Sequence, residues 1–484
     1  MNTPYGELLL ALRPEICLVA GALAVLAVDL PKNSRSPQQR LQISAALGVL
    51  ALVTAGVWGL GAGQPGPLFG GVLSLDMLAQ ATRAGVLGLA LLALGVTAGT
   101  SRLRHPAELV AMILFATTGF TLMAVAQQLL LAFLALETAS LSLYVLAGFD
   151  KSRPESAEAA LKYFLVGGVS AAFLLFGFSL LYGLTGSIEL QEISVQLAMS
   201  GPSPLLVVAL VMILVAFGFK AAAAPFHLWA PDVYEGAPAP SAALIASASK
   251  LAGLALFLRL LWPGLGAAAG NLTGAAGWLP VVALISAASM LLGNFAALAQ
   301  GNVRRLLAYS AIAHAGALLL GVIAAGHSGP GPLFYYAATY GLATVGAFGV
   351  IAVVERAGRC QNLGDLGDLA GLRARSPLLA GCLFVFVLSL AGIPPLAGFV
   401  GKFVVFSAAL QMGGPAGWLA LLAIALSAVA LYYYLLILKQ ALVAPAKESS
   451  PIKVPATAAL ALLAAAALIV VLGLWPSALL GLFQ

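Results

Sequence analysis

Long runs of apolar residues alternate with short polar stretches along the whole chain. Fourteen such runs are bounded by Pro, Gly or charged residues, and a helix needs roughly 20 apolar residues to cross a bilayer. The runs cover residues 10–30, 42–61, 77–98, 107–125, 127–148, 158–184, 203–229, 238–262, 275–299, 305–325, 330–354, 377–411, 415–441 and 455–482. The pattern therefore predicts an all-α polytopic membrane protein with about fourteen transmembrane helices.

Composition supports this interpretation. Of the 484 residues, 62% are hydrophobic and only 8% are charged, so there is too little polar surface to cover soluble domains. The net charge of +6 does not indicate a nucleic-acid-binding protein, because no basic face or aromatic–basic platform accompanies it. The first apolar run lacks a basic segment and an A-x-A site at the expected spacing, so we expect a retained span rather than a signal peptide.

The loop charges predict an orientation for these spans. With the N-terminus outside, the cytoplasmic loops hold most of the basic residues, against Arg13 alone on the outer side. These loop residues are Lys32, Arg35, Arg40, Arg102, Arg104, Lys151, Arg153, Arg304, Arg305, Arg356, Arg359, Arg373, Arg375, Lys439, Lys447 and Lys453. A miscounted span would have scrambled this alternation, so the charges favour fourteen spans with both termini outside.

Six basic residues lie inside the predicted spans, where an ionisable group costs about 2.5 to 3.5 kcal/mol near the bilayer centre. They are Arg83, Lys162, Lys220, Lys250, Arg259 and Lys402. Arg83 and Arg259 lie close to the ends of their runs, so both can reach an interface, and we interpret them as structural anchors. Lys220, Lys250 and Lys402 lie deeper.

Glu137 and Lys250 are the most central of the charged residues. Glu137 lies midway between Gln127 and Gly148, and its side chain is too short to reach an interface. A buried ion pair that only fixes helix packing is the alternative, although a single structural pair would not need so many charges. Lys162 is eight residues past Pro154, or about 12 Å along a helix, so it can either reach the interface or pair with Glu137.

Histidine adds a group that can exchange protons near neutral pH. His314, in "LLAYSAIAHAGALLL", lies well inside its span. A single buried histidine is often a hydrogen-bonded structural residue, but a neutral imidazole can also relay protons. The pattern leaves both roles open.

Prolines mark two spans as irregular. A proline inside a helix removes a backbone donor and clashes with the preceding turn, so each span should break close to its lysine. The residues concerned are Lys220, Pro225 and His227 in the seventh run and Pro394, Pro395 and Lys402 in the twelfth. Discontinuous helices at two corresponding places indicate a transporter site built from an inverted repeat, although tolerated kinks are the alternative.

Together these residues form a row of a carboxylate, several lysines and histidines at middle depth. A lysine pKa falls on desolvation and rises beside a carboxylate, so such a row can bind and release protons as its neighbours move. A sugar or drug pocket would instead gather aromatic and amide groups at one point. The row therefore predicts proton transfer across the membrane midplane.

No cofactor motif accompanies the row. The three cysteines, Cys17, Cys360 and Cys382, are scattered, and the chain has no C-x-x-C, His-x-x-x-His or Gly-rich phosphate loop. We therefore expect no metal, haem, iron-sulfur cluster or nucleotide in this chain.

Several long segments resemble a known family. They are "LETASLSLYVLAGF", "EAALKYFLVGGVSAAFLLFG", "FKAAAAPFHLWAPDVYEGAPAPSAALIASASK", "NVRRLLAYSAIAHAG" and "LAGIPPLAGFVGKF". They resemble the antiporter-like membrane subunits of bacterial NADH-quinone oxidoreductase, respiratory complex I, and among them subunit N. Lysine rather than glutamate at position 402, and no long lateral helix after the last span, favour subunit N over its larger relatives.

The resemblance implies a fold and a set of roles. It implies two inverted five-helix repeats, each with a broken helix, which we assign to residues 107–262 and 263–441, with three helices in 1–106 and a last one in 442–484. Glu137 and Lys220 would interact in the first half-channel, Lys250 would connect the halves, and Lys402 would lead towards the periplasm. Lys162 matches a further family lysine, and His314 lies where a link from Lys250 to Lys402 is needed.

The resemblance further implies a subunit of a proton-translocating NADH:quinone oxidoreductase in the bacterial plasma membrane, with both termini periplasmic. FMN and iron-sulfur clusters are expected in partner subunits, which would be the peripheral redox arm and the other membrane subunits. The alternatives in the same fold are a subunit of a multi-subunit cation/proton antiporter or of a membrane-bound hydrogenase. A membrane scaffold whose buried charges only set helix register is a third.

Overall fold

Helices make up nearly all of the computed structural model, which describes residues 4–30, 36–60, 66–100, 105–358, 365–446 and 450–483. The helices before the first break are α1 Pro4–Ala11, α2 Arg13–Asp29, α3 Pro37–Leu60, α4 Met77–Thr100, α5 Pro106–Val125, α6 Leu129–Ala147, α7 Pro154–Thr185, α8 Leu190–Ser200 and α9 Pro204–Ala221. Between the breaks lie α10 Trp229–Gly236, α11 Ala239–Ala246, α12 Ala248–Arg259, the short turns η2 Leu260–Gly264 and η3 Gly266–Ala268, α13 Trp278–Leu298, α14 Val303–Ser328, α15 Gly331–Ala357, η4 Leu366–Leu369, α16 Leu372–Arg375 and α17 Pro377–Ala391. After the second break come α18 Ala397–Met412, α19 Gly414–Leu442, α20 Ala456–Leu474, α21 Ser477–Leu480 and η5 Gly481–Phe483.

The predicted spans are confirmed in number and kind. Twelve helices in the described residues are long and apolar enough to cross a membrane. The predicted run 377–411 is instead divided into the shorter helices α17 and α18, and the 17-residue helix α2 occupies the first predicted run. An all-α polytopic fold with about fourteen spans is therefore what the chain forms.

Helix starts follow local rules that the sequence contains. Helices α5, α7, α9 and α17 each begin with a proline, which has no amide hydrogen to leave unpaired in the first turn. Ser203 caps α9 by accepting a hydrogen bond from the Leu206 amide at 3.2 Å. Ser376 caps α17 in the same way through the Leu379 amide. Proline and serine together place these ends.

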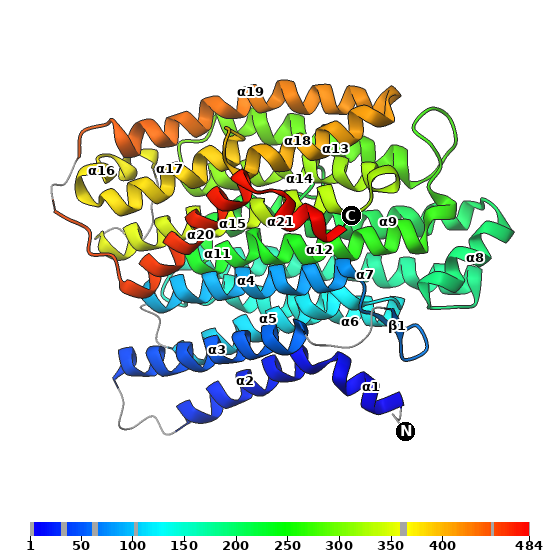
Figure 1. The fold of residues 1–484 in the computed structure, drawn as a ribbon, viewed down its shortest axis with the longest axis horizontal. Helices are drawn as coiled ribbons and strands as arrows, with labels where there is room; N and C mark the ends of the chain where they lie inside the picture. Colours follow the sequence, from blue (N-terminus) through cyan, green and yellow to red (C-terminus); the bar gives the residue numbers. More distant parts are fainter. Residues whose placement is uncertain are drawn as a thin grey trace.

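The long helices run side by side as one bundle, with α2 and α3 along one edge and α19 along the opposite edge (Figure 1). The helical segments α11–α12, α14 and α15 are buried inside the bundle, whereas α7 and α19 expose large apolar side chains such as Phe164, Phe176 and Trp418. An apolar surface of this kind suits a lipid solvent. The interior of the bundle is therefore where the buried charged side chains lie.

Small residues allow close approach of neighbouring helices. A Cβ atom added at Gly293 of α13 would lie 2.4 Å from the backbone nitrogen of Ala313 on α14. One added at Gly119 of α5 would lie 2.5 Å from the backbone nitrogen of Ala139 on α6. Such contacts are typical of membrane helices, whose association depends on van der Waals packing.

Two features differ from expectation. Arg83 and Arg259 are buried in the protein rather than exposed at an interface, because each has a carboxylate partner: Arg83 pairs with Glu15 at 2.8 Å and Arg259 pairs with Asp76. A two-stranded antiparallel hairpin, β1 Pro67–Leu68 and β2 Leu73–Ser74, precedes α4, with Leu68 opposite Leu73.

Several residues used in the sequence analysis lie outside the described residues, namely Lys32, Arg35, Arg102, Arg104, Arg359, Cys360 and Lys447.

Candidate functional site

The first predicted break is confirmed. Helix α9 ends at Ala221, directly after Lys220, and α10 begins at Trp229, so Pro225 and His227 both lie in the irregular segment 222–228. The Ala224 amide donates to Ser289 Oγ on α13 at 2.8 Å, and the Trp229 indole donates to the Phe219 carbonyl at 3.2 Å. These bonds satisfy backbone groups that lipid cannot, which is why a break is tolerated here.

The second predicted break is confirmed as well. Helix α17 ends at Ala391 and α18 begins at Ala397, with Pro394 and Pro395 between them. The Gly398 amide donates to Ser389 Oγ at 3.1 Å. A Cβ atom at Gly398 would lie 1.8 Å from the Ser389 carbonyl oxygen, so only glycine fits.

Each break therefore depends on one serine, Ser289 or Ser389, that the sequence analysis did not single out. Ser289 belongs to a helix distant in sequence from the break it serves, so no local pattern identifies it. Ser389 lies two residues before the end of α17. Its spacing of nine residues from Gly398 is not one that brings residues together on a helix, so no sequence pattern links the two.

Lys220 reaches the helix that carries Glu137. Its side chain is 4% exposed, and Nζ donates to Ser140 Oγ at 3.3 Å. Ser140 is one turn after Glu137 on α6, and Glu137 Oε1 is buried with no hydrogen-bond partner among the described residues. Glu137 and Lys220 form no direct ion pair in the described part of the chain, and Ser140 instead accepts the hydrogen bond from Lys220. The i, i+3 spacing from Glu137 was the signal that could have identified this serine.

Lys250 is held by a helix from the second half of the chain. Its buried Nζ donates to the Ala311 carbonyl of α14 at 2.6 Å and lies 5.3 Å from the ring centroid of Tyr340. The side chain of Lys220 passes α12 one turn further on, where a Cβ atom at Gly253 would lie 3.0 Å from Lys220 Cγ. Lys220 and Lys250 thus approach the same stretch of α12.

The span that carries Lys250 is a third irregular helix. Ser247 interrupts the span between α11 and α12, with φ −114° and ψ −84°, and its Oγ donates to the Ala243 carbonyl at 2.6 Å. A serine that bonds its own helix in this way commonly bends it. No proline marks this break, so the sequence pattern did not predict it.

His314 continues the row on α14, one turn after the carbonyl that accepts from Lys250. Its Nδ1 lies 2.7 Å from the Tyr336 hydroxyl and its Nε2 lies 3.0 Å from the Tyr434 hydroxyl. The Tyr434 hydroxyl in turn bonds Ser310. Both ring nitrogens are therefore engaged by groups that can donate or accept a proton.

A small cavity joins His314 to Lys402. Its volume is about 30 Å³ and its lining includes His314, Tyr336 and Lys402, together with the polar groups of Asn294 and Ser427. That is room for about two water molecules in a polar surrounding. Lys402 itself is buried, and its Nζ donates to the Ala391 carbonyl at 2.9 Å, at the end of α17. The negative end of a helix suits a cation there.

His227 is brought into the buried region but not into this row. It is buried in the first break, and its Nδ1 has no hydrogen-bond partner among the described residues. No hydrogen bond of the described residues links it to Lys220, Lys250 or His314.

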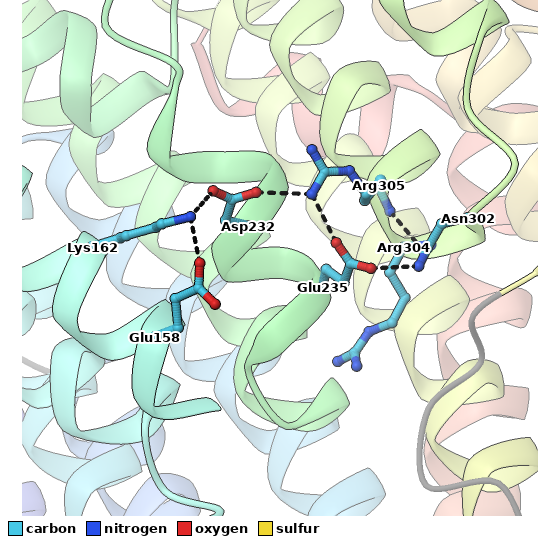
Figure 2. A network of polar contacts seen from close by, with 7 residues as sticks. All are labelled: Glu158, Lys162, Asp232, Glu235, Asn302, Arg304 and Arg305. Atoms are coloured by element: carbon cyan, nitrogen blue, oxygen red, sulfur yellow. Dashed lines mark hydrogen bonds and ion pairs between the residues drawn. The ribbon is translucent and has the colours of Figure 1, made fainter. Parts of the chain in front are cut away.

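Lys162 has a different partner from the one considered for it (Figure 2). Its Nζ lies 2.5 Å from Asp232 and 2.7 Å from Glu158, and its side chain is 43% exposed. Pairing with Glu137 is therefore wrong, because the outward-facing lysine meets two other carboxylates first.

The same network joins three helices. Arg305 of α14 lies 2.8 Å from both Asp232 and Glu235 of α10, and Asn302 donates to Glu235 at 2.8 Å (Figure 2). Lys162 adds α7. Asp232 and Glu235 lie one helical turn apart in "PDVYEG", part of one of the segments quoted above. Their partners lie about 70 residues away in the sequence, Lys162 before them and Arg305 after them.

Metal binding finds no support in the described residues, which contain no group of three His, Cys, Asp or Glu side chains able to hold an ion. Cys17 and Cys382 are free thiols. The site consists of proton-exchanging side chains and serines.

Known proteins share both sequence and fold with this chain. A family model described as "NADH:quinone oxidoreductase/Mrp antiporter, TM" matches residues 126–427. NADH-quinone oxidoreductase subunit N 2 of Acidobacterium capsulatum is 48% identical over 98% of both chains. A chain of respiratory complex I from Thermus thermophilus is 35% identical, with a TM-score of 0.79 over 97% of this chain and 98% of that one.

A more distant likeness concerns the fold alone. A chain of the Mrp complex from Dietzia sp. is 23% identical, with a TM-score of 0.80 over 98% of this chain and 96% of that one. At this identity the likeness shows a shared architecture.

Proposed function

The chain belongs to the NADH:quinone oxidoreductase/Mrp antiporter transmembrane family as a relative of subunit N, and from this premise we propose that its row of Glu, Lys and His side chains conducts protons. The chain is a proton-translocating membrane subunit of an NADH-quinone oxidoreductase. The Mrp likeness concerns the fold alone and so does not favour the antiporter alternative.

The proposed route follows the contacts of the buried row. It runs from Glu137 through Ser140 to Lys220, then past Gly253 to Lys250. From there it continues across the Ala311 turn of α14 to His314, and through the small cavity to Lys402. The observation that carries the proposal is the cavity that His314 and Lys402 share, because it supplies the water-sized step between the last two groups.

The ligands of the lysines support a carrying role. The ammonium groups of Lys250 and Lys402 each donate to a backbone carbonyl, and no carboxylate pairs with either in the described residues. A neutral amine still has N–H groups to donate to a carbonyl, so the bond survives loss of the proton. A lysine held by a carboxylate would instead be tied to its charged form.

The driving force would come from other subunits. We propose that electrons pass from NADH through FMN and iron-sulfur clusters in the peripheral arm to quinone, while neighbouring membrane subunits transmit the change to this chain. The membrane would be the bacterial plasma membrane, with both termini on the periplasmic side. Residues 107–262 and 263–441 would form the two inverted repeats, each with one of the observed breaks, between the helices of 1–106 and 442–484.

The test is a Lys220→Ala variant of the intact complex, reconstituted into vesicles. NADH oxidation and the resulting proton gradient are measured together, and we expect the gradient per NADH oxidised to fall. Lys151→Ala is the matched control, because Lys151 is an exposed loop lysine away from the row. Full proton pumping by an assembled Lys220→Ala complex would exclude the proposed route, and an effect on assembly alone would favour a scaffold role.

A further inference from the structure

A second and larger cavity lies at the other end of the relay helices. Its volume is about 550 Å³, and the ends of α4, α12 and α14 and the chain segment Leu482–Phe483 line it. None of the row residues lines it. A volume of this size is in the range of small-molecule and lipid sites. Figure 1 shows the C-terminal end of the chain beside α21 and α12.

The cavity has one polar end and an otherwise apolar wall. The polar groups are Asp76, Gln127 and Arg259, all next to helix ends, since α4 begins at Met77, α5 ends at Val125 and α12 ends at Arg259. The wall is formed by side chains such as Leu78, Leu258, Trp262, Pro263 and Phe483. Tryptophan near a helix end is typical of the level where lipid headgroups lie.

The polar end is rigid. Arg259 is buried, its Nε donates to the Ala124 carbonyl at 2.8 Å, and its Nη2 pairs with Asp76. Asp76 also accepts the Ala79 amide at 2.8 Å, so its carboxylate is fixed at the start of α4. The Asp76 side chain is nevertheless 43% exposed, which leaves the carboxylate accessible to a ligand.

The polar end of the cavity offers hydrogen-bond acceptors to a ligand. Gln127 Oε1 is buried and has no hydrogen-bond partner among the described residues. A buried amide oxygen left unpaired costs about 1 to 3 kcal/mol, so a ligand that donates to it gains affinity. Asp76 lines the same cavity with a partly exposed carboxylate, so the site offers a carboxylate and an amide oxygen as acceptors.

We propose that this cavity binds one phospholipid with a primary amine headgroup, such as phosphatidylethanolamine. The ammonium donates to Asp76 and to Gln127 Oε1, and an acyl chain covers the apolar wall. A choline headgroup has no N–H to donate, and a glycerol headgroup has no positive charge for Asp76. This inference does not depend on the proton route, since it uses none of its residues.

The experiment uses the intact complex and a phosphatidylethanolamine carrying a photoreactive group in its acyl chain. After illumination, labelled peptides are mapped by mass spectrometry, and we expect label on segments containing Leu78, Leu258 or Phe483. Unlabelled phosphatidylethanolamine should compete about tenfold better than phosphatidylcholine, the ratio for one hydrogen bond from a charged donor. Phosphatidylglycerol is the third competitor.

Two variants test the two ends of the site. Leu78→Trp fills the apolar part and should abolish labelling, whereas Leu161→Trp, at an exposed apolar position of α7, should not. Gln127→Met removes the unpaired acceptor and should keep the labelling but weaken the preference for the amine headgroup, leaving the part that Asp76 supplies. If the Leu78→Trp complex fails to assemble, Gln127→Met still tests the proposed site.

Other outcomes would overturn the proposal. Equal competition by all three lipids would show that the headgroup is not recognised. Absence of label at this cavity, with a cross-link to another subunit in its place, would show that protein covers it. Either result leaves the proton route untouched, because proton pumping is measured separately.

Discussion

Replacing Ala423 by valine would place two methyl groups in the cavity that His314 and Lys402 share. Ala423 is buried on α19 and lines this cavity, whose volume of about 30 Å³ has room for about two water molecules. The substitution changes no charge and no hydrogen-bonding side chain. It therefore tests the water-sized step by itself.

A matched control variant separates the effect on stability from the effect on transport. Ala420, one turn earlier on α19, is also buried but does not line the cavity, so valine there overpacks the core at a cost of about 1 to 3 kcal/mol. At Ala423 the methyl groups gain about 0.8 kcal/mol each by burial, which offsets the lost water contacts. Ala423→Val should therefore be the more stable of the two variants.

Transport should fall in the variant that is more stable. Loss of one hydrogen bond to a charged group is worth about 1.5 to 3 kcal/mol, which slows a step that needs it by about 10 to 100 times. The assay measures proton pumping and NADH oxidation in vesicles, with thermal denaturation of the complex alongside. Normal pumping by Ala423→Val, or equal loss in both variants, would refute the cavity as part of the route.

Three further substitutions probe other parts of the site. Ser389→Ala leaves the Gly398 amide unpaired and should lower the stability of the complex by about 1 to 3 kcal/mol, seen as a lower melting temperature. Gly253→Ala puts a methyl group against Lys220 Cγ at 3.0 Å and should reduce pumping by moving the ammonium, with assembly retained on native gels. Asp232→Asn weakens partly exposed ion pairs worth about 0.2 to 1 kcal/mol each, so it should cost about 1 kcal/mol in thermal stability and leave assembly intact.

Matched controls separate these effects from the chemistry of the substitution. Ser200→Ala removes an exposed serine, Gly88→Ala adds a methyl group where no atom lies within 4 Å, and Glu7→Gln neutralises an exposed carboxylate. Each should behave as the unmodified chain. A Gly88→Ala loss of pumping equal to that of Gly253→Ala would contradict the role given to the Lys220 side chain. A Ser389→Ala complex as stable as Ser200→Ala would contradict the role of its hydroxyl at the break.

The sequence alone determined the spans and the two proline-marked breaks. Spans follow from bilayer thickness, and a proline such as Pro225 disrupts its own helix whatever surrounds it, so both are local consequences of residue type. The cost of burying a charge likewise indicated Glu137, Lys250 and Lys402 without a structure.

Only the tertiary structure decided which groups meet. Lys162 pairs with Asp232 and not with Glu137, Ser289 serves a break on another helix, and Ser247 bends the helix of Lys250 without a proline. These contacts depend on how each helix is rotated and where it crosses its neighbours. Hydrophobic runs that are apolar on every side carry no such rotational signal, so the cavity between His314 and Lys402 had to be seen in the folded chain.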